Sequence, residues 1–240
     1  MSLEILLKHR KIWNKKPLIR FIYQQWYQEI TVLLAAGTTI ELCGGTGNLK
    51  EFTPGLFSSD VLYLPWMDAV INAEALPFKA DSLANIIMVD GLHHIGKVNQ
   101  FFKEASRVLR SGGRIILLEP YISPLSWPFY HFLHEEPVDF HRNPLDHETS
   151  KEGKLPFDAN QAVATMLFEK DYERFQSRFP EFDKIIHRHL PSLVYPLSGG
   201  FGHPQIIPLQ AAKFFSAIER RFEFTGRFLA FRFLVVLEKK

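Results

Sequence analysis

The stretch that decides the fold is Ile40-Glu41-Leu42-Cys43-Gly44-Gly45-Thr46-Gly47, an apolar strand that ends on a carboxylate and enters a glycine-rich loop. Glycine has no Cβ, so such a loop can adopt positive φ angles and let a ligand approach the backbone closely. In an α/β protein, a loop of this kind after the first strand commonly receives a nucleotide-like ligand. The sequence therefore predicts a ligand-binding loop over residues 44–47.

Short apolar strands alternate with helices on both sides of this loop. We expect a helix over 18–34 that stops at Gly37, strands over 38–43, 56–60, 67–73, 83–89 and 114–118, and helices over 47–54 and 98–109. A strand that is covered on both faces has the continuous apolar sequence seen over 83–89. This alternation predicts a parallel, doubly wound α/β sheet.

The regular alternation ends at Tyr121. Many prolines follow, up to about residue 207, so the elements of this region are expected to be short. A long insertion in such a sheet is typical of a lid or a substrate-recognition region. Regularity resumes with a helix over 209–221, and we expect a closing pair of strands over 222–225 and 230–238 around Gly226.

Polar residues follow several predicted strands, at the sheet edge where ligands bind in α/β proteins. Asp60 ends the second strand, where its carboxylate can accept hydrogen bonds from the two hydroxyls of a ribose. Asn72 offers a donor and an acceptor to an adenine edge, and Ala73 offers its backbone. Asp90 follows the fourth strand, and its backbone is expected to border the reacting end of the ligand.

These motifs together resemble a known family. Glu41-Leu-Cys-Gly-Gly45-Thr-Gly47 resembles motif I, E/D-x-G-x-G-x-G, of the class I S-adenosylmethionine-dependent methyltransferases. The segments 72–78, 92–94 and 102–114 resemble later landmarks of the small-molecule ("type 11") branch, so the resemblance covers about residues 38–120. Cys43 replaces the first glycine of the motif, and Asn72 replaces an acidic residue. The sequence after Asp60 predicts a shortened or missing helix, which leaves the adenine side either more open or covered by Trp66.

The resemblance implies one Rossmann-like domain with a mostly parallel seven-stranded sheet, an antiparallel closing strand and a lid-like insertion after the fifth strand. Its parts would be an N-terminal helical cap (1–37), a cofactor-binding core (38–120), the insertion (121–207), and a closing helix with strands (208–240). The implied cofactor is S-adenosyl-L-methionine. The residues expected to bind it are Glu41, Cys43, Gly45, Thr46, Gly47, Asp60, Asn72, Ala73 and Asp90.

The implied activity is methyl transfer to a small-molecule or lipid- or glycan-linked acceptor. The methyl group of the cofactor is already activated, so the protein mainly supplies positioning, and His93 or His94 is the candidate base for an acceptor proton. A net charge of +2 and the lack of a basic stripe argue against nucleic acid as a partner. The single cysteine and the lack of a long apolar segment predict a cytoplasmic protein without integral membrane association.

One stretch of the insertion is rich in histidine and carboxylate side chains. Its spacing matches no zinc signature, so we interpret it as a solvated lid without a bound metal, from which His131 or His134 could reach the acceptor. The stretch comprises His131, His134, Glu135, Glu136, Asp139, His141, Asp146, His147 and Glu148.

Two other functions are compatible with this architecture. A protein that binds S-adenosylmethionine without catalysis would keep the loop and Asp60. An NAD(P)-dependent oxidoreductase is disfavoured, because the fingerprint G-x-G-x-x-G requires a small residue where this chain has Lys50.

Overall fold

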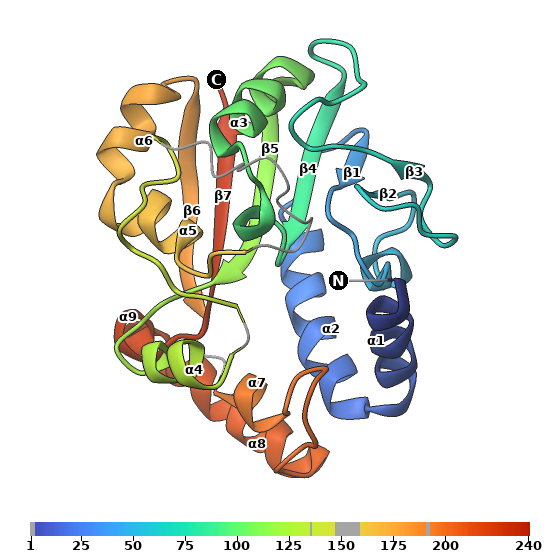
Figure 1. Cartoon of the computed structure of the whole chain (residues 1–240), viewed down its shortest axis with the longest axis vertical. Helices are drawn as coiled ribbons and strands as arrows, with labels where there is room; N and C mark the ends of the chain where they lie inside the picture. The colour runs from blue at the N-terminus through green and yellow to red at the C-terminus, as the bar shows by residue number, and fades with distance from the viewer. Residues whose placement is uncertain (1–2, 135, 147–158, 191–192) are drawn as a thin grey trace.

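The fold is built on a seven-stranded sheet in the order β3-β2-β1-β4-β5-β7-β6 (Figure 1). The computed structural model describes residues 3–134, 136–146, 159–190 and 193–240. Strands β1 to β5 run parallel to one another, and β7 runs antiparallel to both β5 and β6. The strands are β1 (Thr39–Glu41), β2 (Phe57–Asp60), β3 (Ala69–Val70), β4 (Leu83–Val89), β5 (Leu109–Pro120), β6 (Phe182–Leu190) and β7 (Arg232–Lys239).

Helices cover both faces of the sheet. The α-helices are α1 (Leu3–Lys15), α2 (Pro17–Thr31), α3 (Val98–Val108), α4 (Ser126–Phe132), α5 (Val163–Thr165), α6 (Tyr172–Arg178), α7 (Val194–Leu197), α8 (Leu209–Glu219) and α9 (Gly226–Leu229). Tighter or wider helical turns form η1 (Asn48–Glu51), η2 (Leu92–His94), the π-helix η3 (Met166–Lys170) and η4 (Arg220–Thr225).

Each face of the sheet has its own core because side chains alternate along a strand. In β4, Ile86 and Met88 pack into the core beneath α3, η3 and α6, whereas Ile87 between them packs into the core beneath α2. All three side chains are fully buried. The continuous apolar sequence of this strand is therefore explained by cover on both faces.

Several predicted elements are confirmed. Strand β4 spans 83–89 and helix α3 begins at Val98, as the sequence predicts. No helix occurs between β2 and β3, a connection whose residues are all described. The expected helix over 47–54 is only the single turn η1, and the expected strand over 67–73 is reduced to Ala69–Val70.

One of the two predicted closing strands, over residues 222–225, does not form. Residues 222–225 belong to η4, and the outer partner of β7 is instead β6, which lies within the segment 121–207. Strand β6 is hard to recognise because it lies at the sheet edge and reads Phe-Asp-Lys-Ile-Ile-His-Arg-His-Leu, with polar side chains on both faces. An edge strand needs less apolar sequence than a central one, since part of it remains in contact with water.

Candidate active site

A cleft of about 250 Å³ opens at the carboxyl ends of β1, β2 and β4. One wall comes from the glycine loop, and another comes from the turn after β4 with Asp90 and His93. Helices α1 and α2 add Leu6, His9 and Tyr23, while the segment after β5 adds His134 and Glu136. The cleft therefore lies where ligands bind in open α/β sheets.

The glycine loop and Asp60 meet directly at this cleft. The Gly45 N–H donates to Asp60 Oδ2 at 2.9 Å, and the Leu62 N–H donates to Asp60 Oδ1 at 3.0 Å. An ionised carboxylate has about four acceptor positions, so two backbone bonds leave acceptor positions for a ligand. The predicted convergence of this carboxylate with the loop is thus present in the structure.

Trp66 and Arg10 cover the outer side of the loop. Gly47 has φ of 72°, and a Cβ added to it would lie 2.9 Å from Trp66 Cδ1. The Trp66 indole N–H donates to Gly45 O at 2.8 Å, and the Arg10 guanidinium lies 4.5 Å from the Trp66 ring centroid. Only glycine combines this backbone angle with this close contact.

Cys43 occupies a position that glycine normally fills. Its φ is 56°, in the left-handed region that non-glycine residues rarely adopt. The side chain fits because residue 91 is glycine: a Cβ on Gly91 would lie 2.9 Å from Cys43 Cβ. Burial raises the pKa of the thiol, so Cys43 acts as a small apolar side chain.

Glu41 is a buried carboxyl group beneath the loop. The Ser58 hydroxyl donates to Glu41 Oε2, and Ser59 Oγ donates to the Glu41 carbonyl at 2.8 Å. Burial raises the pKa of Glu41 to about 7, although the Ser58 hydrogen bond opposes the shift. This carboxyl group lines the cleft and can change its charge near neutral pH.

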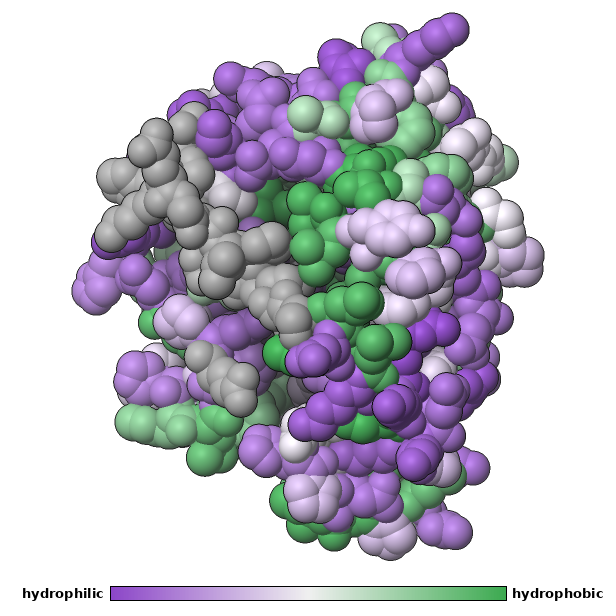
Figure 2. Space-filling model, turned by 45° about the vertical axis from the view of Figure 1, so that its right-hand side comes forward, coloured by the Kyte–Doolittle hydropathy of each residue, from purple (hydrophilic) through white to green (hydrophobic). Residues whose placement is uncertain are grey.

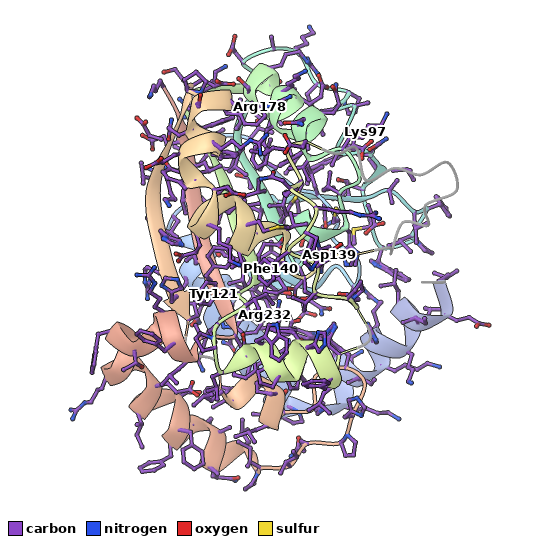
Figure 3. The ribbon with its side chains drawn as sticks, turned by 60° about the vertical axis from the view of Figure 1, so that its left-hand side comes forward. Lys97, Tyr121, Asp139, Phe140, Arg178 and Arg232 are labelled. Carbon is purple, nitrogen blue, oxygen red and sulfur yellow. The ribbon has the colours of Figure 1, made fainter. Side chains whose placement is uncertain are left out.

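Asp90 forms an ion pair with Arg232, which sequence reasoning did not place in the site. Asp90 has φ of 55°, and its Oδ1 contacts the Arg232 guanidinium while Tyr23 OH donates to Oδ2 at 3.3 Å. Arg232 begins β7, is 3% exposed, and lies 4.6 Å from the Tyr195 ring centroid (Figure 3). The only sequence signal was a lone arginine at the start of an apolar strand.

His93 is held by Glu119, a second residue that sequence reasoning missed. Glu119 Oε1 accepts the N–H groups of Gly91 and Leu92 at 2.9 and 2.7 Å, and Glu119 Oε2 lies 2.6 Å from His93 Nδ1. Burial alone lowers the pKa of His93, but Glu119 and Glu136 outweigh it and raise the pKa to about 10. The sequence feature that could have identified Glu119 is its position directly after the apolar run Ile115–Leu118, at the end of a predicted strand.

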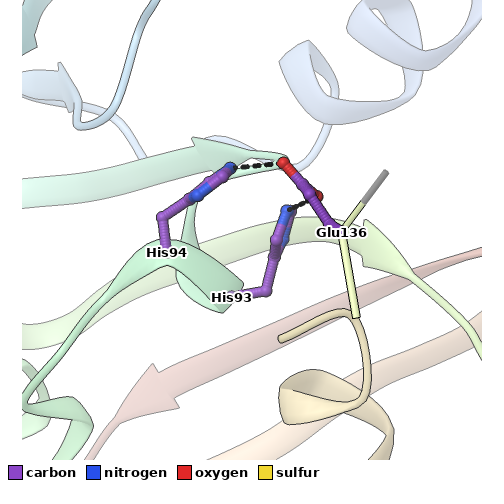
Figure 4. A group of neighbouring side chains, drawn as sticks. All are labelled: His93, His94 and Glu136. Atoms are coloured by element: carbon purple, nitrogen blue, oxygen red, sulfur yellow. Dashed lines mark ion pairs between the residues drawn. The ribbon is translucent and has the colours of Figure 1, made fainter. Parts of the chain in front are cut away.

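Glu136 closes the cleft over both histidines (Figure 4). Its Oε2 lies 3.5 Å from His93 Nε2, and its Oε1 lies 3.7 Å from His94 Nε2. The Gln161 amide donates to Glu136, and the Glu136 N–H donates to His134 Nδ1 at 3.2 Å. Burial raises the pKa of Glu136, but its contacts with the histidines outweigh burial and lower it to about 2.

The predicted His- and carboxylate-rich stretch does not act as one group. Glu136 and His134 line the cleft, whereas His131 stacks on Trp127 and Asp146 pairs with Arg174. Asp139 accepts the His141 N–H within its own turn. Glu135, His147 and Glu148 lie outside the described residues.

Two predicted adenine contacts do not line the described cleft. Asn72 is exposed and accepts the Glu74 N–H at 2.9 Å, which closes a local turn. Ala73 is 5% exposed and packs into the core beneath α3. Their role in cofactor binding stays a prediction.

His93, His94 and Glu136 also have the chemistry of metal ligands. Each offers one ligand atom, and these atoms lie within 4.8 Å of one another. The same atoms can equally serve proton transfer, because imidazole and carboxylate groups both accept protons.

The strand order, the antiparallel β7 and the glycine loop over the cleft define a Rossmann-like methyltransferase fold. Residues 60–117 match the model of a family described as "Methyltransferase domain". Over this segment, which includes Asp60, Asp90, His93 and His94, the chain is therefore similar to methyltransferase domains.

The chain is similar to curated and solved methyltransferases. It is 30% identical over 108 residues to a ubiquinone/menaquinone biosynthesis C-methyltransferase of Hahella chejuensis, a match that covers 35% of this chain and 43% of that relative. A second protein of this description, from Allorhizobium ampelinum, is 33% identical over 89 residues, covering 36% of this chain and 32% of the relative. The matched segments thus span less than half the length of these relatives.

Solved structures support the fold over nearly the whole chain. A SAM-dependent methyltransferase from Thermotoga maritima, described as a possible histamine N-methyltransferase, superposes with a TM-score of 0.51 and 18% identity, covering 97% of this chain and 99% of that one. Geranyl diphosphate C-methyltransferase from Streptomyces coelicolor gives a TM-score of 0.50 and 14% identity, covering 92% of this chain and 79% of that one. Among the described residues, no helix has the length and apolar character needed to cross a membrane.

Proposed function

We propose that this chain binds S-adenosylmethionine in the described cleft and transfers its methyl group to an acceptor that enters from the side of His94 and Glu136. The observation that carries the proposal is the convergence of the Gly45 backbone and the Asp60 carboxylate on this cleft, opposite Asp90. The match of residues 60–117 to a methyltransferase domain supports it.

Each wall of the cleft suits one part of the cofactor. Asp60 has acceptor positions for ribose hydroxyls, and the loop at Gly45 allows a ligand to approach the backbone closely, whereas Gly47 is covered by Trp66 and does not line the cleft. Glu41 is the proposed neighbour of the methionyl amino group, and the Asp90 backbone is the proposed neighbour of the methionyl region. Asn72 and Ala73 remain the proposed neighbours of the adenine, which requires Asn72 to leave its local turn.

We assign different roles to the two histidines. Because Glu119 and Glu136 raise the pKa of His93 to about 10, His93 is an imidazolium at neutral pH, and its two N–H groups face these two carboxylates, so its proposed role is to hold Glu136 in place. His94 is the proposed proton acceptor. Glu136 stays ionised and would stabilise the His94 imidazolium as it forms.

The cofactor, when bound, supplies a methyl group activated by the positive sulfur. The acceptor atom would form a bond to that methyl group as the sulfur–methyl bond breaks, and the proton of the acceptor would pass to His94 Nε2. The chain itself then orients the acceptor and excludes water from the cleft.

Calorimetric titration with S-adenosylmethionine and S-adenosylhomocysteine tests the cofactor proposal. We expect saturable binding of one molecule per chain, with weaker binding by the variant Asp60→Ala. Asp183→Ala is the matched control, because Asp183 is 57% exposed on the outer strand β6. Absence of binding to the unmodified chain would overturn the proposal, whereas binding without turnover on any acceptor would favour a binding protein without catalysis.

A lipid-linked acceptor is favoured by the unusual orientation of α8. This helix buries the small residues Ala212 and Ser216, whereas Phe214, Phe215 and Ile218 are 63%, 43% and 38% exposed. A helix in a soluble domain normally buries its large apolar side chains. The exposed face of α8 is therefore suited to an apolar environment outside the chain.

Neighbouring elements extend this apolar face around the end of the molecule that holds α4, α8 and α9 (Figure 1). Phe224 and Phe228 are 80% and 62% exposed, and Phe132 in α4 is 70% exposed. Figure 2 shows hydrophobic side chains at the surface of this lower end. We call the exposed side chains of Phe132, Phe214, Phe215, Ile218, Phe224 and Phe228 the apolar end surface.

The basic residues beside the apolar end surface favour a membrane with anionic lipids as its binding partner. Lys213, Arg221 and Arg227 are exposed on the same elements. Aromatic side chains combined with basic residues are typical of surfaces that lie in the headgroup region of a bilayer. Tyr195 in α7 lines the cleft, and α7 contacts α8, so a lipid-linked acceptor could pass from the bilayer to the cleft over a short path.

A further inference from the structure

A second cluster of histidine and carboxylate side chains lies outside the cleft. His187 and His189 are two positions apart in β6, so both point to the same face of the sheet. Glu169 reaches them from the π-helix η3. The three side chains are 22%, 18% and 16% exposed, which shields the cluster from solvent but leaves it accessible.

The three side chains converge on a single point. His187 Nε2 lies 3.1 Å from Glu169 Oε1, and His189 Nε2 contacts the same oxygen. One ligand atom from each residue lies within 4.8 Å of the others. Metal–ligand bonds of about 2.0–2.2 Å place neighbouring ligand atoms roughly 3–3.5 Å apart, so small side-chain shifts suffice to admit an ion.

The surrounding structure fixes the two imidazole rings. In the β6–β7 register His187 faces Val235 and His189 faces Phe233. The Tyr121 ring centroid lies 4.5 Å from that of His189. A Cβ on Gly226 would lie only 2.6 Å from His189 Cβ, so this glycine lets α9 pack tightly against the strand.

The backbone around Glu169 is also unusual. The Asp171 N–H donates to Met166 O at 2.8 Å, the i→i+5 bond that defines a π-helix. Such single π-turns occur frequently at functional sites, where they redirect a side chain. The nearby Lys184 ammonium donates to Phe168 O at 3.0 Å, lies over the Tyr172 ring, and also interacts electrostatically with Glu169.

We propose that Glu169, His187 and His189 bind one divalent transition-metal ion, with water in the remaining positions. Two imidazole nitrogens and one carboxylate suit Zn²⁺, Co²⁺ or Ni²⁺, whereas Mg²⁺ and Ca²⁺ prefer oxygen ligands throughout. The ion would connect the outer strand β6 to η3 and strengthen an edge of the sheet. The absence of metal predicted from the sequence rested on the stretch 131–148, which does not contain these residues.

This site is separate from the proposed methyl-transfer cleft. Arg232 lines the cleft and contacts Trp26 and Tyr195, which belong to the side of the sheet covered by α2 and α7. His187 and His189 pack with Phe233, which belongs to the core on the other face. The proposal therefore does not depend on the proposed function.

Titration of the chelator-treated full chain with Zn²⁺ and Co²⁺ tests the metal site. We expect saturable binding by calorimetry, and an intense visible absorption from Co²⁺ in a site of low coordination number. The variants Glu169→Gln, His187→Gln and His189→Gln should each weaken this binding at least 10-fold. His131→Gln is the matched control, since His131 stacks on exposed Trp127.

The histidine pair in the cleft requires its own comparison. His94→Gln should leave metal binding by Glu169, His187 and His189 unchanged. If His94→Gln abolishes metal binding while the variants of Glu169, His187 and His189 retain it, the proposed site is wrong. Absence of saturable binding to the unmodified chain would also overturn it. Because the variants could unfold, NMR of the unmodified chain provides a second measurement: Zn²⁺ should shift the imidazole signals of His187 and His189, and unchanged signals would contradict the proposal.

Discussion

Cys43, which lines the cleft, and Gly91 form a matched pair: a Cβ on Gly91 would lie 2.9 Å from the Cβ of Cys43. Residue 43 thus has a side chain where the methyltransferase motif has glycine, and residue 91, in the turn that faces it, has none. The backbone at Cys43 keeps the positive φ that a glycine would adopt. The loop therefore retains its shape despite the substitution in its motif.

This pairing predicts a strong coupling between positions 43 and 91. Gly91→Ala should destabilise the fold by about 1–3 kcal/mol, because the added methyl group meets Cys43 in a packed interior. In the background Cys43→Gly the same change should cost clearly less, since Met88 Cβ at 3.3 Å is then the main remaining contact. Urea unfolding of the four proteins measures the coupling, and additive changes would contradict the steric explanation.

Asp60 is expected to control cofactor affinity. Replacement by alanine removes the acceptor for the Gly45 and Leu62 N–H groups and the proposed partner of the ribose. Hydrogen bonds to a charged group contribute about 1.5–3 kcal/mol, so the Kd for S-adenosylmethionine should rise roughly 10- to 100-fold. Calorimetry measures the change against Asp183→Ala, and an unchanged Kd for Asp60→Ala would exclude this ribose contact.

The pKa of His93 predicts a loss of stability in alkaline solution. Since the folded pKa is raised from 6.5 to about 10, the charged imidazole contributes its full stabilisation below pH 6.5 and loses it as the pH rises toward 10. One proton gives a slope of at most about 1.4 kcal/mol per pH unit. Glu41, with a pKa raised to about 7, titrates mostly below pH 7.5. The slope of stability between pH 7.5 and 9.5 therefore reports mainly on His93.

Urea unfolding at several pH values in this window measures the slope. His93→Gln should flatten it, because glutamine keeps hydrogen-bonding capacity but does not titrate. His131→Gln, which changes a histidine on the exposed side of α4, should leave the slope as in the unmodified chain. Equal slopes in the unmodified chain and His93→Gln would show that His93 is not charged between Glu119 and Glu136.

The apolar end surface predicts binding to anionic membranes. The chain should sediment with vesicles that contain phosphatidylglycerol, and the double variant Phe214→Ser with Phe215→Ser should bind several-fold more weakly. Removal of two half-exposed aromatic side chains lowers the apolar area available to the bilayer. Higher salt should weaken binding further, since Lys213, Arg221 and Arg227 act through charge.

The double variant Val32→Ser with Tyr63→Ser provides a control, because both residues are 80% exposed but lie outside the apolar end surface. Equal binding by vesicles without anionic lipid would argue against the role of the basic residues. Absence of vesicle binding together with concentration-dependent dimerisation would assign the surface to a second copy of this chain instead.

The sequence by itself determined the central strands, the glycine loop and Asp60. Buried parallel strands require continuous apolar runs, and a loop with positive φ angles favours glycine, so these features are local and visible in the order of residues. The tertiary structure alone decided the partners of the charged groups: Arg232 meets Asp90 across 142 positions, and Glu119 meets His93 across 26. The same holds for β6, whose polar sequence forms a strand only because β7 offers it a hydrogen-bonding edge. Such contacts depend on how distant segments pack against one another, and no local pattern of residue types specifies that packing.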